Sequence, residues 1–477
     1  MRAYIIIFAG CLVLPMACGQ DKNNELLQKA QKAGQLVREG KPQDAIPIYL
    51  QLVQASPNRP EFFVDLCVAE FKAKQYRDVI EHAGAALKLN PNLPVASLLL
   101  GASYLEIGQH TNAVAPLEKA LAAMPKDRNA RLMLAEALSG ASRYEEALQQ
   151  FHSAAEVLPD SSRVWYGMGQ VYDALAERVC RDTQNRFPDS AYSWALTGDS
   201  DLRERRFGSA YAAFRRSLAK GPVLPGVHTE LARVYTETGH PDWAAKEQSL
   251  EITAPKAPEN SGEPAASYSR CKTNRNLADE SYARLSQLAP SVESHLHAAK
   301  VLDAAGRHRE AVSEWRNGLQ LAPQNIQAQL GLAWSLYLLR DYDPVLPILA
   351  HLLEIQPDSG DMEFLYGATL LNLEKPEAAI PHLQAALGRN PQMRAAQAAL
   401  GQALLRCGRP EQAIPYLQAS LAEDSDGDAH FQLFRAFQLT GKEDLAKRAL
   451  ADYRKIRAAH SQKDQNERPT PITGPAP

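Results

Sequence analysis

The sequence predicts an all-α solenoid of antiparallel helix pairs, with about 11–12 repeats in two arrays. The first observation behind this prediction is that proline recurs with a spacing of 34 residues. The second is that small and large residues return to fixed positions between these prolines. The spacing is kept by Pro57, Pro91, Pro125 and Pro159, and again by Pro323, Pro357 and Pro391.

Two neighbouring units, Pro94–Asp127 and Arg128–Ser161, show the fixed positions most clearly. Small residues at positions 8 and 20 let two antiparallel helices approach closely, and a large residue at position 24 fills the space beside them. Proline at position 32 follows the second helix because proline cannot continue a helix. Positions 8, 20 and 24 hold Gly101, Ala113 and Leu117 in the first unit, and Ala135, Ala147 and Phe151 in the second.

This pattern resembles the tetratricopeptide repeat, and the resemblance covers most of residues 26–460. It implies a right-handed superhelix in which the first helix of each pair lines a concave surface, chiefly through positions 2, 5, 9 and 12. It also implies protein or peptide partners and no cofactor. Position 5 carries no Lys or Arg in any unit, so the chain departs from the family members that hold a C-terminal carboxylate with basic residues.

The N-terminus, residues 1–19, is typical of an export signal, with Arg2 followed by an apolar run that is too short to span a membrane. Two processing routes fit the residues that follow. Cleavage before Gln20 would give a periplasmic or secreted protein. Alternatively, residues 14–18 resemble a bacterial lipobox with Cys18 as the lipidated residue, although Pro15 departs from that motif.

We expect an N-terminal array over residues 20–254, with an irregular unit near 173–190 that lacks the small residue at position 20. A linker plus a lone helix, about Asn276 to Leu288, is expected over residues 255–290, because Pro and Gly are frequent between Thr253 and Ser269. Each break contains a cysteine, a short helix and a proline. We interpret the two breaks as related units that have lost or altered a first helix.

A C-terminal array is expected over residues 291–460. Its last helix carries many basic residues, which suits a capping helix with a solvated outer face. Residues 461–477 contain four prolines and no apolar periodicity, so we expect a disordered tail.

Cysteine usage does not identify a compartment. Cys67 falls at the small position 8 and Cys407 near the end of a first helix, and both are expected to be structural thiols. Cys180 and Cys271 lie in the two breaks, but two full units separate them, so a disulfide between them is not expected. No zinc-type spacing of Cys and His is present in the sequence.

Composition and motifs argue against catalysis and nucleic-acid binding. Apolar residues make up 45%, charged residues 22% and the formal net charge is −3, with both signs interspersed. The sequence contains no phosphate-binding loop, dinucleotide fingerprint, metalloprotease motif or nucleophile elbow. His295 and His297 lie on different faces of a helix, so a metal site is not expected either.

Two inner surfaces are the candidate partner-binding sites. In the C-terminal array, Leu330, Trp334, Tyr337 and Phe364 cluster at concave positions, and aromatic residues there are typical of interaction hot spots. We expect the surface over residues 326–372 to hold an extended or helical peptide, with packing between first helices as the alternative. The remaining candidates are Phe431 and Arg435 farther along, and an N-terminal trough of Val64, Val68 and Phe71 with Leu98 and Leu105.

The resemblance and the leader together predict an exported, non-catalytic scaffold that binds proteins or peptides. The alternative is a lipid-anchored assembly factor of an envelope secretion, pilus or exopolysaccharide apparatus, as several exported members of this family are. Acylation of Cys18 would favour the alternative, and a mature form that begins at Gln20 would favour the scaffold.

Overall fold

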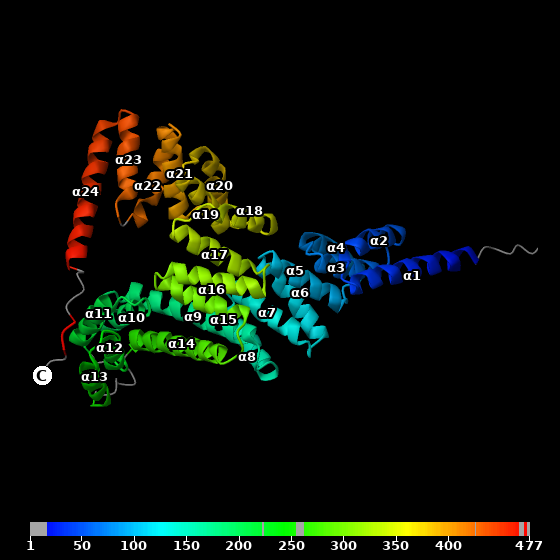
Figure 1. Ribbon diagram of the computed structural model, residues 1–477, viewed down its shortest axis with the longest axis horizontal. Helices are drawn as coiled ribbons and strands as arrows, with labels where there is room; N and C mark the ends of the chain where they lie inside the picture. The colour runs from blue at the N-terminus through cyan, green and yellow to red at the C-terminus, as the bar shows by residue number, and fades with distance from the viewer. Residues whose placement is uncertain (1–16, 222–223, 254–261, 425, 467–471, 475–477) are drawn as a thin grey trace, which may run out of the picture. The chain divides into compact units, whose positions relative to one another are not determined.

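All regular secondary structure in the described part of the chain is helical, as predicted (Figure 1). The computed structural model describes residues 17–221, 224–253, 262–424, 426–466 and 472–474. These residues form 24 α-helices and one short 3-10 helix, and no strand. Packing divides the chain into two compact units, Met1–Pro159 and Asp160–Pro477, which we call unit 1 and unit 2.

Unit 1 consists of four helix pairs, each made of helices that follow one another in the sequence. Gly101 and Leu117 show why the pairs form: a Cβ added to Gly101 would lie 2.5 Å from Cγ of Leu117. The small residue at position 8 therefore gives room for the large residue at position 24. The pairs are α1 (Ala17–Arg38) with α2 (Pro42–Ala55), α3 (Pro60–Lys72) with α4 (Tyr76–Leu89), α5 (Pro94–Glu106) with α6 (His110–Ala123), and α7 (Arg128–Gly140) with α8 (Tyr144–Val157).

Unit 2 contains seven further pairs of consecutive helices. Gly367 and Gly401 meet Leu383 and Leu417 in the same way as Gly101 meets Leu117. The pairs are α10 (Ala191–Arg203) with α11 (Phe207–Lys220), α12 (Val227–Glu237) with α13 (Pro241–Thr253), α15 (Val292–Ala304) with α16 (His308–Leu321), α17 (Ile326–Leu338) with α18 (Val345–Ile355), α19 (Gly360–Asn372) with α20 (Pro376–Arg389), α21 (Arg394–Arg406) with α22 (Pro410–Ser420), and α23 (Asp428–Leu439) with α24 (Glu443–Asn466). The 3-10 helix Leu421–Glu423 follows α22.

The remaining pair joins helices that are distant in the sequence (Figure 1). Helices α9 (Ser162–Arg186) and α14 (Gly262–Ser286) are each 25 residues long and pack along one another. A Cβ on Gly169 would lie 2.5 Å from the Tyr282 ring, which is the contact between positions 8 and 24. One repeat is thus split, with its first helix in α9, its second in α14, and α10–α13 inserted between them. The interpretation of two units that each lost a first helix is therefore wrong.

The expected linker and lone helix also differ from the structure. The helix begins at Gly262, well before Asn276, so the second half of the predicted connection is helical. Ser267, Tyr268 and Cys271 are buried in this added part, because α14 packs against α9 and α10 along its length. Residues 254–261 of the predicted linker lie outside the described residues.

Cys180 and Cys271 form a disulfide, contrary to the expectation, with their Cα atoms 5.5 Å apart. The two cysteines were expected to be far apart because two repeats separate them in the sequence. In the structure α14, which follows those two repeats, packs directly on α9 and brings the cysteines together. Gly169 contacts Tyr282 and Cys180 contacts Cys271. The two contacts are the same number of residues apart on α9 and on α14, in opposite chain directions, as expected for two antiparallel helices packed without a shift in register. Cys67 and Cys407 are free, as predicted.

Two parts of the tail that was expected to be disordered, residues 461–466 and 472–474, are ordered, and the rest of the tail lies outside the described residues. Helix α24 extends to Asn466, and residues 472–474 lie against unit 2, where Ile472 packs on the apolar cluster of α10–α14. Disorder is therefore wrong for these residues, because an apolar side chain and two hydrogen bonds fix them. In α24 and the turn before it, the basic residues expected on an outer face are exposed: Lys442, Lys447, Arg448, Arg454, Lys455 and Arg457.

Most of the predicted leader, residues 1–16, lies outside the described residues. Cys18 lies in the first turn of α1, and its side chain is also outside them. Among the described helices, none combines the length and the apolar character needed to cross a membrane.

Candidate partner-binding groove

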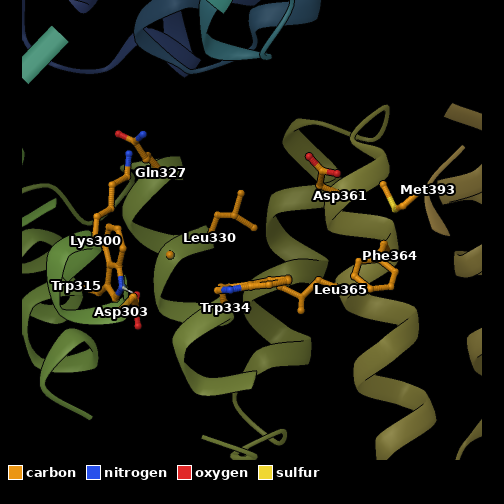
Figure 2. A pocket seen from close by; sticks show the side chains of 11 residues that line it. Lys300, Asp303, Trp315, Gln327, Leu330, Trp334, Asp361, Phe364, Leu365 and Met393 are labelled. Atoms are coloured by element: carbon orange, nitrogen blue, oxygen red, sulfur yellow. Dashed lines mark hydrogen bonds between the residues drawn. The ribbon is translucent and has the colours of Figure 1, made fainter. Parts of the chain in front are cut away.

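A groove with a volume of about 610 Å³ runs over the first helices of successive repeats in unit 2 (Figure 2). Its walls come from α15, α17 and α19, and Met393 just before α21 closes one end. Most lining side chains stand at repeat positions 2, 5, 9 and 12, where the resemblance places the concave surface. The lining residues are Lys300, Asp303, Trp315, Gln327, Leu330, Gly331, Trp334, Asp361, Phe364, Leu365 and Met393.

Three of the predicted binding residues meet in this groove: Leu330, Trp334 and Phe364. Figure 2 shows the Trp334 indole lying between α17 and α19. Trp334 keeps 41% of its surface exposed, which is unusual for so large an apolar side chain. Leu330 and Phe364 are partly buried and also pack against neighbouring core clusters. The structure thus gives Leu330 and Phe364 a packing role and leaves Trp334 exposed, and contact of these three residues with a ligand stays a prediction.

Tyr337, the fourth predicted residue of this cluster, supports the groove from the side. Its ring stacks on Trp334 with centroids 6.0 Å apart, and its hydroxyl accepts a hydrogen bond from Asn372 Nδ2 at 3.2 Å. Burial raises the pKa of the Tyr337 hydroxyl. Because Asn372 belongs to α19, this hydrogen bond ties α17 to α19 beside the groove.

One wall of the groove is fixed by a hydrogen-bond network around Asp303. Trp315 Nε1 donates to Asp303 Oδ2 at 3.0 Å and to Ser335 Oγ at 2.9 Å, and the Ser335 hydroxyl donates to Asp303 Oδ2 at 2.6 Å. His308 Nδ1 lies 2.9 Å from the other carboxylate oxygen. A buried indole and a buried hydroxyl are thereby satisfied, and α15, α16 and α17 are joined into one wall.

Gly331 makes this wall possible. A Cβ at this position would lie 2.5 Å from the Trp315 ring. A glycine in α17 therefore lets the indole of the preceding repeat lie directly against the helix backbone.

The two ends of the groove differ in charge, because the Lys300 ammonium and the hydrogen-bonded Asp303 carboxylate line one end and the Asp361 carboxylate lines the other. Figure 2 shows Lys300 of α15 at one end and Asp361 of α19 at the other. The Lys300 ammonium lies 5.4 Å from the centroid of the Tyr166 ring, a cation–π arrangement. Asp361 is exposed in the first turn of α19 and has no ion-pair partner among the residues that the structure describes. Between these ends the surface is mainly apolar.

Beneath the Lys300 end lies a cluster of titratable groups that joins the split repeat to α15. Tyr282 donates a hydrogen bond to Asp173 Oδ2 at 2.8 Å, and the His297 ring stacks on Tyr282 with centroids 3.8 Å apart. Burial, with a smaller contribution from Lys300, lowers the pKa of His297 to about 4. His297 is therefore neutral at pH 7 and packs as an aromatic group.

Phe431 and Arg435 do not line the groove. Phe431 of α23 packs against Phe434 and Tyr453, with ring centroids 6.0 Å and 5.2 Å away, and keeps 37% of its surface exposed. Arg435 donates a hydrogen bond from Nη1 to Gln432 Oε1 at 3.3 Å. A role for this pair in binding stays a prediction.

The N-terminal trough residues are distributed over three apolar clusters of unit 1. Val64 packs with the cluster of Phe63, Val68 with that of Leu66, and Phe71 with that of Cys67. Each is partly buried, so the structure gives each a packing role. Partner binding here also stays a prediction.

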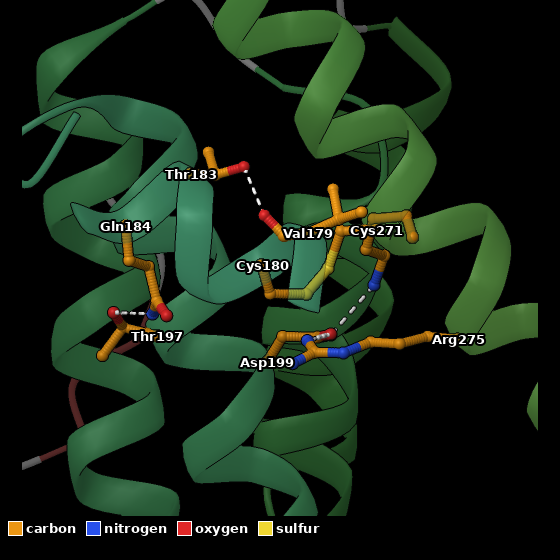
Figure 3. The surroundings of a disulfide bond; sticks show 9 residues. Val179, Cys180, Thr183, Gln184, Thr197, Asp199, Cys271 and Arg275 are labelled. Carbon is orange, nitrogen blue, oxygen red and sulfur yellow. Dashed lines mark hydrogen bonds and ion pairs between the residues drawn. A yellow bond between two sulfur atoms is a disulfide. The ribbon is translucent and has the colours of Figure 1, made fainter. Parts of the chain in front are cut away.

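A second cavity, of about 400 Å³, lies between α9, α10 and α14 beside the disulfide and is lined mainly by polar side chains. Figure 3 shows Asp199 of α10 directed at Arg275 of α14 next to Cys180 and Cys271. Lys272 also contacts this carboxylate, at 2.9 Å. Burial alone would raise the pKa of Asp199, but the two cations hold it below its usual value. These ion pairs fasten α14 to α10.

Several groove residues were not named by the sequence prediction: Lys300, Asp303, Trp315, Gln327, Gly331, Asp361, Leu365 and Met393. Four of them could have been found, because they stand at the expected concave positions 9, 12, 2 and 2 of their units: Lys300, Asp303, Gln327 and Asp361. Gly331 and Met393 stand at no such position, and only the packing of neighbouring repeats brings them to the groove. Within the described residues, no group of three or more His, Cys, Asp or Glu side chains has metal-binding geometry.

Curated relatives share short segments with this chain. The chain is 34% identical over 104 residues to the small glutamine-rich tetratricopeptide repeat-containing protein 2 of Mycosarcoma maydis, which covers 22% of the chain and 30% of the relative. It is 39% identical over 106 residues to tetratricopeptide repeat protein 37 of Xenopus laevis, which covers 22% of the chain and 7% of the relative. It is 46% identical over 66 residues to the human superkiller complex protein 3, covering 14% and 4%. The chain thus spans less than a third of each of these relatives.

Solved structures with a similar arrangement of helices include MamA from Desulfovibrio magneticus RS-1, with a TM-score of 0.33 at 16% identity, covering 36% of this chain and 97% of that one. Another is YrrB, described as a TPR protein with an unusual peptide-binding site, with a TM-score of 0.30 at 21% identity, covering 35% and 90%.

Family models match the chain in three places. Each model is described as a tetratricopeptide repeat, and the matches cover residues 64–128, 104–171 and 265–424. Repeats of this family typically mediate protein–protein interactions and bind protein or peptide partners without catalysis. The matched segments, with their paired helices and their small residues at position 8, identify the chain as one that carries tetratricopeptide repeats in both of its units.

Proposed function

We propose that this chain is an exported, non-catalytic scaffold that binds a peptide segment of a partner protein in the groove around Trp334. The observation that carries the proposal is the exposure of Trp334, at 41%, in a groove of about 610 Å³ built from first helices. An indole exposed to this degree costs free energy in water, and a ligand that covers it would recover that cost.

The lining favours a particular kind of peptide. Leu330, Phe364 and Leu365 form an apolar floor beside the indole, and Lys300 and Asp361 offer opposite charges at the two ends. A peptide with a central aromatic or branched apolar side chain would fill the floor. An acidic group toward α15 and a basic group toward α19 would fix its direction.

Export is proposed on two observations. The leader-like N-terminus is one, and the disulfide between Cys180 and Cys271 is the other. Disulfides form and persist in oxidising compartments outside the cytosol, so a periplasmic or secreted location agrees with this pair.

The groove is tested by selecting peptides from a displayed library on the full chain. The selected peptides are then measured against the Trp334→Ala, Phe364→Ala double variant. We expect affinity to fall at least tenfold, since buried aromatic anchors dominate such interfaces. The matched control is the double variant Leu321→Ala, Leu439→Ala, which removes apolar side chains exposed by 56% and 63% outside the groove. Equal binding by the groove variant and the control would refute the groove as the site.

The compartment and the anchor are tested by expressing the full chain in a bacterial host that has an envelope. Mass spectrometry of the mature N-terminus separates cleavage before Gln20 from acylation of Cys18. Acylation would favour the lipid-anchored assembly factor over the free scaffold. An intact leader on a cytosolic chain would contradict both.

A further inference from the structure

Residues 472–474, near the C-terminus, lie on a defined surface of the inserted helices of unit 2. Figure 1 shows the red trace of residues 472–474 near α11 and α12. Ile472 packs against the apolar cluster that includes Tyr211, Leu231 and Tyr235. Residues 472–474 therefore lie on α11, α12 and α13, far along the sequence from the helix that precedes them.

Two tyrosine hydroxyls hold Thr473. Tyr235 donates a hydrogen bond to the Thr473 carbonyl oxygen at 2.8 Å, and the hydroxyls of Tyr211 and Thr473 lie 2.7 Å apart. Tyr235 has no exposed surface, so the tail supplies the acceptor that its buried hydroxyl requires. The hydrogen bond from Tyr235 recognises the backbone of the segment, and the hydrogen bond between Tyr211 and Thr473 recognises the threonine side chain.

Gly474 lies against Trp243. A Cβ at this position would come within 2.9 Å of Cε2 of the indole. Trp243 itself is held in place, stacked on His240 at 4.2 Å and edge-on to Tyr235 at 5.6 Å. The indole cannot easily move aside, so the surface selects a residue without a side chain at this point.

We propose that the surface of Tyr211, Tyr235 and Trp243 is a second peptide-binding site, which takes an extended segment of a branched apolar residue, threonine and glycine. Its resident occupant is the C-terminal segment of this chain, Ile472–Gly474. The tail thereby keeps the surface closed to any partner that carries a segment of the same chemistry.

This site is separate from the groove around Trp334. Tyr211, Tyr235 and Trp243 stand at positions 21, 11 and 19 of their units, none of which is a concave position. They belong to the helices inserted into the split repeat, whereas the groove belongs to α15, α17 and α19. The inference therefore does not depend on the proposed groove.

Tethering explains why the chain's own tail occupies the site. A segment joined to the receptor has an effective concentration in the millimolar range when its linker can span the distance. Pro471 and Pro475 flank the segment in the sequence, and proline reduces the conformational freedom that binding must remove. A free partner displaces the tail when the ratio of its concentration to its own Kd exceeds the ratio of the tail's effective concentration to the Kd of the tail.

The test measures binding of a fluorescent decapeptide with the sequence of residues 468–477. The receptors are the wild-type full chain, the full chain with Gly474→Leu, and a chain that ends at Asn466. We expect the second and third to bind the peptide at least tenfold more tightly than the wild type, because their sites are vacated. A decapeptide that carries Gly474→Leu should bind all three weakly, since its side chain would meet the Trp243 ring.

Tyr235→Phe, introduced into the chain with Gly474→Leu, removes the donor to the Thr473 carbonyl. It should weaken peptide binding roughly 2- to 12-fold. Circular dichroism and an intact Cys180–Cys271 disulfide serve as checks on folding, and the full-length Gly474→Leu chain gives the answer even if the shortened chain misfolds. Equal binding by all receptors, or no binding to the folded Gly474→Leu chain, would overturn the proposal.

Discussion

Gly169 of α9 lies directly beneath the ring of Tyr282 in α14, so close that a Cβ would come within 2.5 Å of the ring. This contact between positions 8 and 24 is the one that joins the helices of the ordinary repeats. Here it joins two helices between which four others are inserted. The solenoid of unit 2 is thus interrupted within a repeat and not between repeats.

The contact predicts that Gly169→Ala destabilises unit 2 by about 1–3 kcal/mol, because the added methyl group overpacks a rigid ring. Gly388→Ala in α20 is the matched control, since a Cβ there meets nothing within 4 Å. The control should be neutral or stabilise by up to about 1 kcal/mol, from helix propensity. Urea unfolding followed by tryptophan fluorescence measures both, because all five tryptophans belong to unit 2. Equal midpoints for the two variants would contradict the split repeat.

The disulfide predicts that reduction destabilises unit 2. The bond closes a sequence separation of 91 residues, so the Cys180→Ser, Cys271→Ser variant should lose about 2–5 kcal/mol. The same fluorescence-detected unfolding, with and without reductant, measures the loss. Without reductant, iodoacetamide should alkylate Cys67 and Cys407 in the denatured chain and leave the other pair unmodified. Alkylation of Cys180 and Cys271 under these conditions would disprove the bond.

His297 predicts a loss of stability in acid. Burial lowers the pKa of His297 in the folded chain to about 4. As the pH falls, this histidine is therefore protonated in the unfolded chain at a higher pH than in the folded chain, and its protonation favours unfolding. Stability from this group is complete above the ordinary pKa of histidine and is lost between about pH 6.5 and pH 4, by about 2–3 kcal/mol.

The comparison with His297→Gln isolates this effect, because the other charged groups that face the cluster, Asp173, Asp279 and Lys300, are present in both chains. The variant should show a smaller decrease in unfolding free energy between pH 7 and pH 4. His351→Gln, a change at a half-exposed side chain in α18, should keep the wild-type decrease. If His297→Gln also keeps it, the imidazole is not buried as the structure shows.

The turns between paired helices predict a stabilising substitution. Arg340 adopts a φ of 60° at position 15 of its unit, where Gly306 adopts 70° in the preceding unit. This left-handed conformation costs a residue with a Cβ atom about 1 kcal/mol, so Arg340→Gly should raise the free energy of unfolding of unit 2 by about that amount. Gly306→Ala should lower it by a similar amount. Fluorescence-detected unfolding tests both, and changes of the same sign would contradict the shared turn.

The sequence by itself determined the repeat. Its period of 34, the small residues at positions 8 and 20 and the prolines after second helices place the ordinary helix pairs correctly, because these signals are local. The same periodicity assigned Leu330, Trp334 and Phe364 to one concave face. The structure brings those three together in one groove.

The second half of the split repeat could also have been predicted from the sequence. Ala278, Tyr282 and Pro290 have the same spacing as Ala311, Trp315 and Pro323, so they could have been recognised as the second half of a repeat. Their first half lies on the far side of α10–α13, and no local signal states which distant helix is the partner.

Tertiary structure alone decided the pairing of α9 with α14, the disulfide that this pairing permits, and the place of the tail. Each depends on contacts between residues distant in the sequence. Such contacts form when apolar surface and buried hydroxyls find their complement in space, whatever the spacing along the chain. Local periodicity determined the helices, and long-range packing decided which of them are partners.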